Sequence, residues 1–109
     1  MNKKKKIRQN FRTSVFERDG YMCRKCPIPV KNVDLDAHHI TDRNKMPNGG
    51  YVKENGISLC DECHIKAEVF HSSNGERCVV GFHPDTLYEL IGSNEKDAFD
   101  ASIMLINKL

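Results

Sequence analysis

Residues 55–64 have the sequence NGISLCDECH, which joins a short apolar segment to a CxxC motif and a histidine. A second CxxC motif begins upstream at Cys23, and residues 27–59 lie between the two motifs. Two such pairs bring four thiolates within reach of one tetrahedral zinc ion, which would compensate for the limited core of a small domain. Four unligated buried thiols and a redox-active motif are the alternatives, and two motifs argue against the redox role. The predicted zinc ligands are Cys23, Cys26, Cys60 and Cys63.

The composition predicts one small domain. The chain has 109 residues, no tryptophan and 7% aromatic residues, so its hydrophobic core is modest. It has no apolar run near the roughly 18 residues that cross a bilayer, and no apolar segment follows the basic N-terminus as in a secretory signal. We therefore expect a cytoplasmic protein that is not bound to a membrane and whose thiols stay reduced. The fifth cysteine, Cys78, is expected to be a small buried apolar residue.

Hydrophobic spacing in the first two thirds of the chain predicts both helices and strands. Phe11, Val15 and Phe16 share one helical face, and Gly20 is placed to end that helix. Residues 33–40 alternate between apolar and polar side chains, as in a half-buried strand. The predicted elements are a helix over residues 10–19, a strand over residues 33–40, a loop over residues 41–56, a short strand over residues 57–59 and a helix capped by Asp61 that continues to about Phe70.

The C-terminal third is predicted to contain a short strand over residues 78–82 and two helices. Pro84 favours a first helical position, and Gly92 favours a helix end. A last helix over residues 94–108 is expected to serve in packing or as a surface for a partner. Its apolar residues at helical spacing are Phe99, Ile103 and Ile106.

Four polar residues near the cysteines form a candidate catalytic cluster. Neighbouring strand residues point to opposite faces, so His38 and His39 are not expected to bind the same ion easily. One of them is expected to bind a metal ion together with His64, and the other to act as a base. Two neutral imidazoles leave most coordination positions open for water and phosphate oxygens, as in a catalytic metal site. The cluster consists of His38, His39, Asn55 and His64.

The motifs around this cluster occur in a specific order. They are Arg18-Asp19-Gly20, Cys23-x-x-Cys26, Asp36-Ala37-His38-His39-Ile40, Asn55-Gly56-Ile57-Ser58-Leu59-Cys60 and Cys60-x-x-Cys63-His64. In order, spacing and flanking residues together they resemble the HNH endonucleases of the zinc-bearing, McrA-like kind. The resemblance covers residues 11 to about 70 and implies an α+β fold, a small ββα-metal finger with a four-cysteine zinc site and flanking helices.

The resemblance also implies a role for each residue of the cluster. His39 corresponds to the general base that activates water for attack on a DNA phosphodiester, and His38 and His64 correspond to ligands of the catalytic ion. Asn55 corresponds to the middle Asn, which braces the loop and orients the base. The usual ion is Mg²⁺ or Mn²⁺, although two imidazoles also suit Ni²⁺, Co²⁺ or Zn²⁺. Gly56 departs from the Leu that often follows this Asn.

Basic residues are concentrated near the N-terminus. Residues 1–25 contain nine basic and two acidic residues, a net charge of +7, whereas the whole chain has +2. This asymmetry favours contact with a polyanion, and with the resemblance it predicts binding to double-stranded DNA. A homodimer or a phage or bacterial protein partner is also compatible, and the small size and basic tail fit a phage or prophage protein by analogy. The candidate DNA contacts are Arg12, Arg18, Arg24, Lys25, Arg43 and Lys45.

We divide the chain into a basic flexible arm (residues 1–9), an HNH nuclease domain with the zinc site (residues 10–75) and a C-terminal helical extension packed on the same domain (residues 76–109). The predicted function is that of a metal-dependent HNH endonuclease that hydrolyses DNA phosphodiester bonds. The alternative is a catalytically inactive, zinc-dependent DNA-binding module. The presence of the complete His–Asn–His set favours the nuclease.

Overall fold

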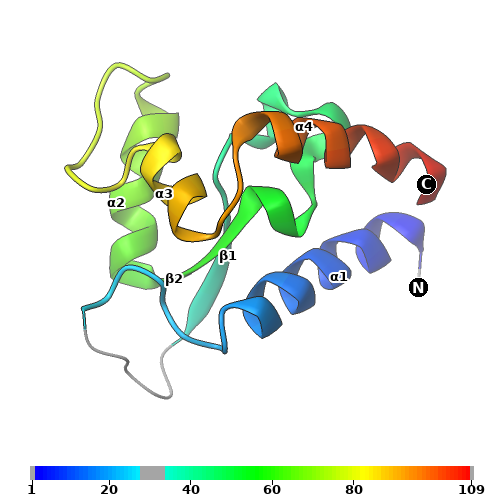
Figure 1. Cartoon of the computed structure of the whole chain (residues 1–109), viewed down its shortest axis with the longest axis horizontal. Coiled ribbons are helices and arrows are strands. Elements are labelled where there is room, and N and C mark those ends of the chain that lie inside the picture. Colours follow the sequence, from blue (N-terminus) through cyan, green and yellow to red (C-terminus); the bar gives the residue numbers. More distant parts are fainter. Residues whose placement is uncertain (1, 28–33, 109) are drawn as a thin grey trace.

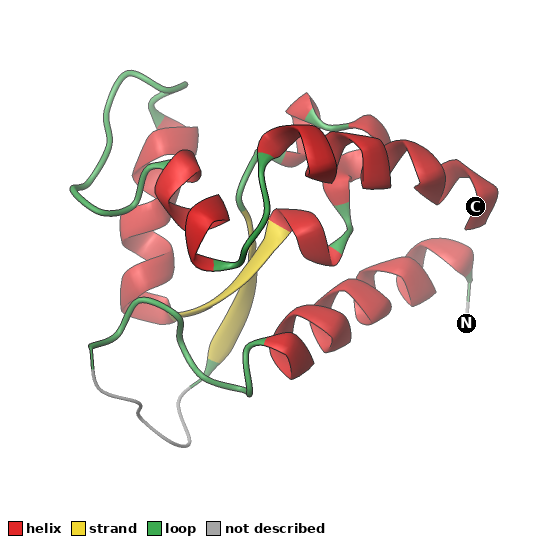
Figure 2. Ribbon diagram, in the orientation of Figure 1, coloured by secondary structure: helices red, strands yellow, loops and turns green. Residues whose placement is uncertain are grey.

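Two short antiparallel strands form the centre of the protein, and helices lie on both sides of them (Figure 1). The computed structural model describes residues 2–27 and 34–108. Figure 2 shows the few strand residues among the more numerous helical ones, in agreement with the predicted α+β class. The main elements are α1 (Lys3–Arg18), β1 (Leu35–His39), β2 (Gly56–Cys60), α2 (Asp61–Ser72), α3 (Pro84–Leu90) and α4 (Glu95–Met104).

The two strands form a hairpin whose second strand is almost entirely buried. β1 pairs with β2 so that His38 lies opposite Ile57 and His39 lies opposite Gly56. Ile57 and Leu59 are fully buried in the hydrophobic core. Both predicted strands are therefore confirmed, although Val33, the first residue expected in the earlier one, lies outside the described residues.

Helix α1 approaches β2 very closely at Gly56. A Cβ atom at this position would lie 2.5 Å from Cγ2 of Val15 and 2.7 Å from Cε1 of Phe11. Those two side chains are the buried residues of α1. A larger residue at position 56 would push the helix away from the strand, so the glycine that departs from the related pattern has a packing reason.

Helix α1 begins earlier than the sequence analysis predicted. Residues 3–9 are helical and continuous with the rest of α1, so the expectation of a helix beginning at residue 10 is wrong. The side chain of Asn2 accepts a hydrogen bond from the backbone amide of Lys5 (2.8 Å) and caps the helix, and lysine is itself a good helix former. Gly20 follows the helix with φ +65°, as its predicted role in ending the helix requires.

The connection between the strands contains three short 3₁₀ helices, η1 (Arg43–Lys45), η2 (Pro47–Gly50) and η3 (Lys53–Asn55). The residue before α2 is Cys60, which makes no side-chain capping bond, whereas the predicted cap Asp61 is the first helical residue. An acidic residue in the first turn still stabilises the helix through its dipole.

The C-terminal third differs from the prediction in two places. Residues 78–82, all within the described part of the chain, form no strand, and Cys78 is exposed rather than buried. Without a partner strand, the apolar residues in this segment have no ladder to join. Helix α3 does begin at Pro84, and Gly92 follows it with φ +69°.

Helix α4 packs against the protein through small residues. Ala98 and Ser102 are fully buried, and the backbone carbonyl of Ser102 accepts a hydrogen bond from the side chain of Asn48 (3.0 Å). The apolar residues whose helical spacing predicted a packed face are instead partly exposed: Phe99 is 44% exposed, Ile103 45% and Ile106 63%. Even so, no helix of the described chain is both long and apolar enough to span a membrane.

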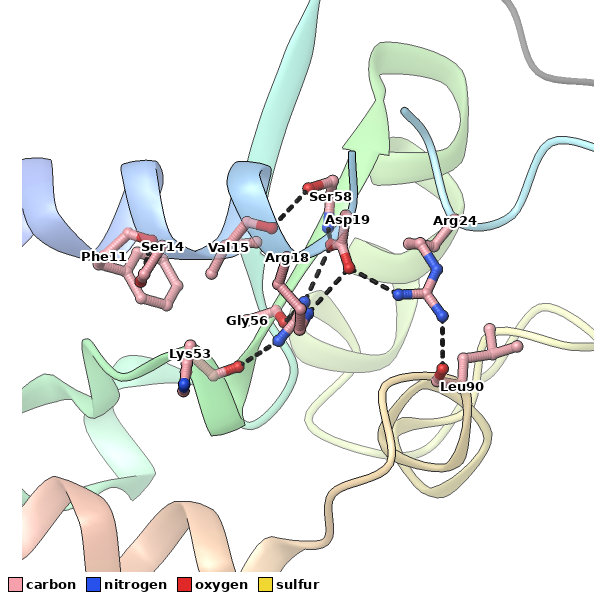
Figure 3. Close-up of polar contacts among 10 residues, drawn as sticks. All are labelled: Phe11, Ser14, Val15, Arg18, Asp19, Arg24, Lys53, Gly56, Ser58 and Leu90. Atoms are coloured by element: carbon pink, nitrogen blue, oxygen red, sulfur yellow. Dashed lines mark hydrogen bonds and ion pairs between the residues drawn. The ribbon is translucent and has the colours of Figure 1, made fainter. Parts of the chain in front are cut away.

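A buried carboxylate connects α1 to the hairpin and to α3 (Figure 3). Asp19 accepts hydrogen bonds from Nε of Arg18 (2.8 Å), Nη1 of Arg24 (2.6 Å) and the backbone amide of Ser58 (2.8 Å). Although burial by itself raises the pKa of Asp19, the hydrogen bonds from Arg18, Ser58 and Arg24 lower it below the ordinary value of 3.8. The charged form of Asp19 is therefore part of the folded structure.

The two arginines of this network also bind backbone carbonyls. Arg18 donates to the carbonyls of Lys53 and Gly56, each at 2.6 Å, and Arg24 donates to the carbonyl of Leu90 at 2.6 Å. Both guanidinium groups thus join separate segments of the chain. We therefore assign Arg18 and Arg24 to the fold and do not retain them as DNA contacts.

Candidate active site

Four cysteine sulfur atoms converge where β2 meets α2. Sγ of Cys26 lies 3.7 Å from Sγ of Cys60 and 4.0 Å from Sγ of Cys63, and all four sulfur atoms, including that of Cys23, lie within 4.8 Å of one another. Sulfur atoms bound at about 2.3 Å to a tetrahedral zinc ion lie about 3.8 Å apart. The cluster therefore fits the expected structural zinc site. It brings the turn after α1 to the end of the hairpin.

A second group of potential metal ligands lies between β1 and α2. The ligand atoms of His38, His64 and Glu68 lie within 4.8 Å of one another. Oε1 of Glu68 is 3.2 Å from Nδ1 of His38 and 3.2 Å from Nε2 of His64. Two imidazole nitrogens and a carboxylate oxygen on one side of a site are a common ligand set for divalent transition metals.

The surroundings of His38 support a metal at this position. Its side chain is 1% exposed, and its buried Nδ1 atom makes no well-directed hydrogen bond to the described residues, although Oε1 of Glu68 lies 3.2 Å away. Burial lowers the pKa of His38, which favours the neutral imidazole that a metal ion requires as a ligand. A buried polar atom left without a partner is costly in a folded protein, and a bound cation at this place would remove that cost.

Two carboxylates surround His64. Its Nδ1 atom lies 3.0 Å from Oδ2 of Asp36, and its Nε2 atom lies 3.2 Å from Glu68. A neutral imidazole has one N–H group, so it cannot donate to both carboxylates. Donation to Asp36 would leave the Nε2 lone pair facing the same point as Glu68 and His38, as in carboxylate–histidine–metal triads.

The sequence analysis missed Asp36 and Glu68 as members of this site. Periodicity contains a signal for both: Asp36 is two residues before His38 and therefore on the same strand face, and Glu68 is four residues after His64 on the same helix face. Spacing alone does not distinguish such carboxylates from the exposed acidic residues that are common on helices.

His39 lies on the opposite face of β1 from His38. Its ring stacks on Phe11 at 4.5 Å between centroids and meets the edge of Tyr51 at 4.7 Å. Its Nε2 atom is buried and makes no hydrogen bond to the described residues. Burial, together with the charge of Arg43, lowers the pKa of His39 to about 4, so the imidazole is neutral near pH 7. A neutral imidazole is able to accept a proton.

His71 also lies at the site. Its Nε2 atom donates a hydrogen bond to the backbone carbonyl of His39 (2.9 Å), and its ring stacks on that of His38 (5.2 Å between centroids). One side chain of α2 thus contacts both histidines of β1 and fixes the strand relative to the helix.

A cleft of about 410 Å³ is lined by His39 and also by His64 and Glu68, two of the potential metal ligands. Three arginines at its wall give it a positive charge, Arg8 and Arg12 from α1 and Arg43 from the loop. The candidate DNA contacts Lys25 and Lys45 do not line it: the ammonium of Lys25 lies over the ring of Phe82, and that of Lys45 donates to Asn74. The lining residues are Arg8, Phe11, Arg12, Ala37, His39, Asp42, Arg43, Tyr51, His64, Glu68 and His71.

Comparison with known proteins identifies this arrangement. Residues 23–69 match the family model described as HNH endonuclease. These residues form an HNH domain. No curated protein and no solved structure matches the chain. The matched residues include both CxxC motifs and all four residues of the predicted catalytic cluster, which confirms the family resemblance.

Asn55, the expected middle residue of the HNH motif, is fully buried. Oδ1 of Asn55 accepts hydrogen bonds from the backbone amide of Thr41 (2.9 Å) and the hydroxyl of Tyr88 (2.7 Å). Its Nδ2 atom donates to the carbonyls of Thr41 (3.1 Å) and Gly50 (3.2 Å). A Cβ atom at Gly50 would lie 2.7 Å from this Nδ2 atom, so only glycine permits the close approach. Asn55 therefore holds the loop of the HNH domain to the end of β1.

Proposed function

We propose that this chain is a metal-dependent DNA endonuclease that hydrolyses phosphodiester bonds. The observation that carries the proposal is the cleft itself. His39 lies in it together with His64 and Glu68, two of the three potential metal ligands, and three arginines line its wall. A nuclease requires a base, charge compensation at the phosphate and stabilisation of the leaving oxygen, and this cleft offers groups for each.

The chain's own residues have distinct tasks in this proposal. His39 accepts a proton from the attacking water, and stacking on Phe11 together with the edge contact of Tyr51 keeps its ring in place. Arg8, Arg12 and Arg43 bind the phosphates that flank the scissile bond. Asn55 and His71 fix the backbone at the C-terminal end of β1, so that the base keeps its position.

His38, His64 and Glu68 are the proposed ligands of the catalytic ion. When bound, a divalent ion supplies positive charge to the phosphate and to the leaving 3′ oxygen. Two imidazoles and one carboxylate suit Mn²⁺, Co²⁺, Ni²⁺ or Zn²⁺, whereas Mg²⁺ prefers a site made of oxygen ligands. We therefore expect Mn²⁺ or Ni²⁺ to support cleavage better than Mg²⁺.

The test is cleavage of supercoiled plasmid by the zinc-loaded parent and by His39→Ala, each with EDTA, Mg²⁺, Mn²⁺, Co²⁺ or Ni²⁺. We expect metal-dependent nicking by the parent and a loss of about 100-fold or more in the variant, because a general base contributes about 10²–10⁴-fold. His83→Ala is the matched control, since His83 is exposed and does not line the cleft.

Two results would contradict parts of the proposal. Cleavage by His39→Ala at the parent rate would show that another group is the base. Salt-sensitive DNA binding without cleavage under any metal would replace the nuclease with the catalytically inactive, zinc-dependent binding module.

A further inference from the structure

A tyrosine outside the matched HNH residues reaches the centre of the HNH motif. Tyr88 belongs to α3 and is 2% exposed. Its hydroxyl donates a hydrogen bond to Oδ1 of Asn55 (2.7 Å) and lies 2.7 Å from Oγ1 of Thr41. A phenol has one hydrogen, so the Thr41 hydroxyl is the donor to the Tyr88 oxygen. The three side chains form a directed chain from Thr41 through Tyr88 to Asn55.

This hydroxyl completes the hydrogen bonding of Asn55. A side-chain amide has two acceptor positions and two donor hydrogens, and all four are used here. Three of the partner groups are backbone atoms of Thr41 and Gly50, which lie in the same loop as Asn55. The fourth comes from Tyr88, so α3 supplies the one contact that holds the amide from outside the loop.

The C-terminal third contacts the same loop at further points. Ser93 donates to the carbonyl of Glu54 (2.9 Å), and Asn48 donates to the carbonyl of Ser102 (3.0 Å). These contacts involve backbone carbonyls and hold the loop as a whole. The contact from Tyr88 differs because it ends on the functional side chain itself.

We propose that Tyr88 is a positioning residue of the nuclease site, which fixes the Asn55 amide and, through Thr41, the end of the strand that carries His39. The inference rests on the proposed function. It assigns the C-terminal extension a role in catalysis that the HNH residues alone do not supply. Removing the hydroxyl leaves a buried amide oxygen with one unfilled acceptor position, so the amide and the strand end that it holds lose a fixed orientation.

The experiment compares zinc-loaded full-length Tyr88→Phe with the parent and with Tyr21→Phe, a matched control because Tyr21 is 60% exposed. Plasmid nicking gives kcat and KM, and ¹H–¹⁵N spectra follow the side-chain NH₂ signals of Asn55, which an Asn55→Ala sample identifies. We expect Tyr88→Phe to lower kcat about ten-fold with KM for DNA unchanged, and to shift or broaden the Asn55 signals. Tyr21→Phe should change neither.

Thr41→Val is a second variant that keeps the tyrosine ring and removes the donor to its oxygen. It should lower kcat less than Tyr88→Phe does and move the same Asn55 signals. Unchanged kcat and unchanged Asn55 signals in Tyr88→Phe would overturn the proposal, as would spectral changes spread over the whole chain with kcat and KM both altered. If the parent does not nick DNA with any metal, the proposed function fails, and the Asn55 signals alone then decide whether Tyr88 holds the amide.

Discussion

Oε1 of Glu68 lies 3.2 Å from Nδ1 of His38, although one residue belongs to α2 and the other to β1. The contact with His38 lowers the pKa of Glu68 to about 2, so the carboxylate is charged near pH 7. A charged carboxylate oxygen beside a buried imidazole nitrogen is a favourable place for a cation. The contact between Glu68 and His38 therefore joins α2 to β1 at the proposed metal site.

Replacing Glu68 should weaken binding of the catalytic ion without affecting the structural zinc. Glu68→Gln removes the negative charge and keeps the size of the side chain, so we expect affinity for Mn²⁺ to fall about ten-fold or more in calorimetric titrations of zinc-loaded protein. Glu62→Gln is the control on the same helix, because the Glu62 side chain is 82% exposed. Equal Mn²⁺ affinity in parent and Glu68→Gln would remove Glu68 from the ligand set.

Asp36 should act on the ion through His64. Asp36→Asn weakens the partner that orients the imidazole, and outer residues of this type change metal affinity by about 10–100-fold. The nitrogen shifts of His64 in ¹⁵N spectra should also report a change in the preferred tautomer. Asp34→Asn provides the control, since Asp34 is exposed and two residues away. An unaltered tautomer together with unaltered affinity would rule out this role.

Loss of one zinc ligand should unfold much of the domain, because binding energy at a structural zinc site contributes directly to folding. We expect Cys60→Ser to contain less than one zinc per chain and to lose cooperative thermal unfolding, as measured by metal analysis and circular dichroism. Cys78→Ser makes the same chemical change at an exposed cysteine outside the cluster and should resemble the parent. A Cys60→Ser protein with the parent's melting temperature would contradict the zinc assignment.

The Asp19 network should make stability depend on pH. Since the pKa of Asp19 is lower in the folded than in the unfolded chain, its contribution is present above about pH 4 and is lost as the pH falls through the folded-state value. At pH 7 we expect Asp19→Asn to cost about 3 kcal/mol of unfolding free energy, because two arginines lose their buried partner. Urea denaturation at decreasing pH should show this difference shrinking. A difference that stays constant down to the lowest pH at which both proteins fold would contradict the assignment.

Arginines in the cleft should contribute to DNA binding, and those in the Asp19 network should not. Arg43→Gln should weaken binding and reduce the slope of log K against log salt by about one. Arg24→Gln removes the same charge from the network, so it should lower the unfolding free energy and leave the salt slope unchanged. Fluorescence anisotropy with a labelled duplex measures both slopes. Equal slopes in the parent and Arg43→Gln would exclude Arg43 from the interface.

Sequence patterns alone were sufficient to predict the cysteine cluster, the hairpin and the helix that follows it. The two CxxC motifs have a spacing that is specific for a shared ion, and they enclose the HNH motif in a fixed order. Period-two alternation placed His38 and His39 on opposite faces of β1, which the structure confirms through their different neighbours. The hairpin strands and the helix depend on residues near one another in the chain, whereas the cysteine cluster joins two distant motifs that are each recognisable by their own spacing.

Tertiary structure alone decided which side chains complete the site and which face of α4 is buried. The spacing of Phe99, Ile103 and Ile106 suits a packed helix, yet Ala98 and Ser102 are the buried residues, and the loop between the strands contacts that face of the helix through Asn48. Glu68, His71 and Tyr88 contact the motif from two different helices. Periodicity describes one element at a time, whereas the distance between two elements is set by the packing of the whole chain.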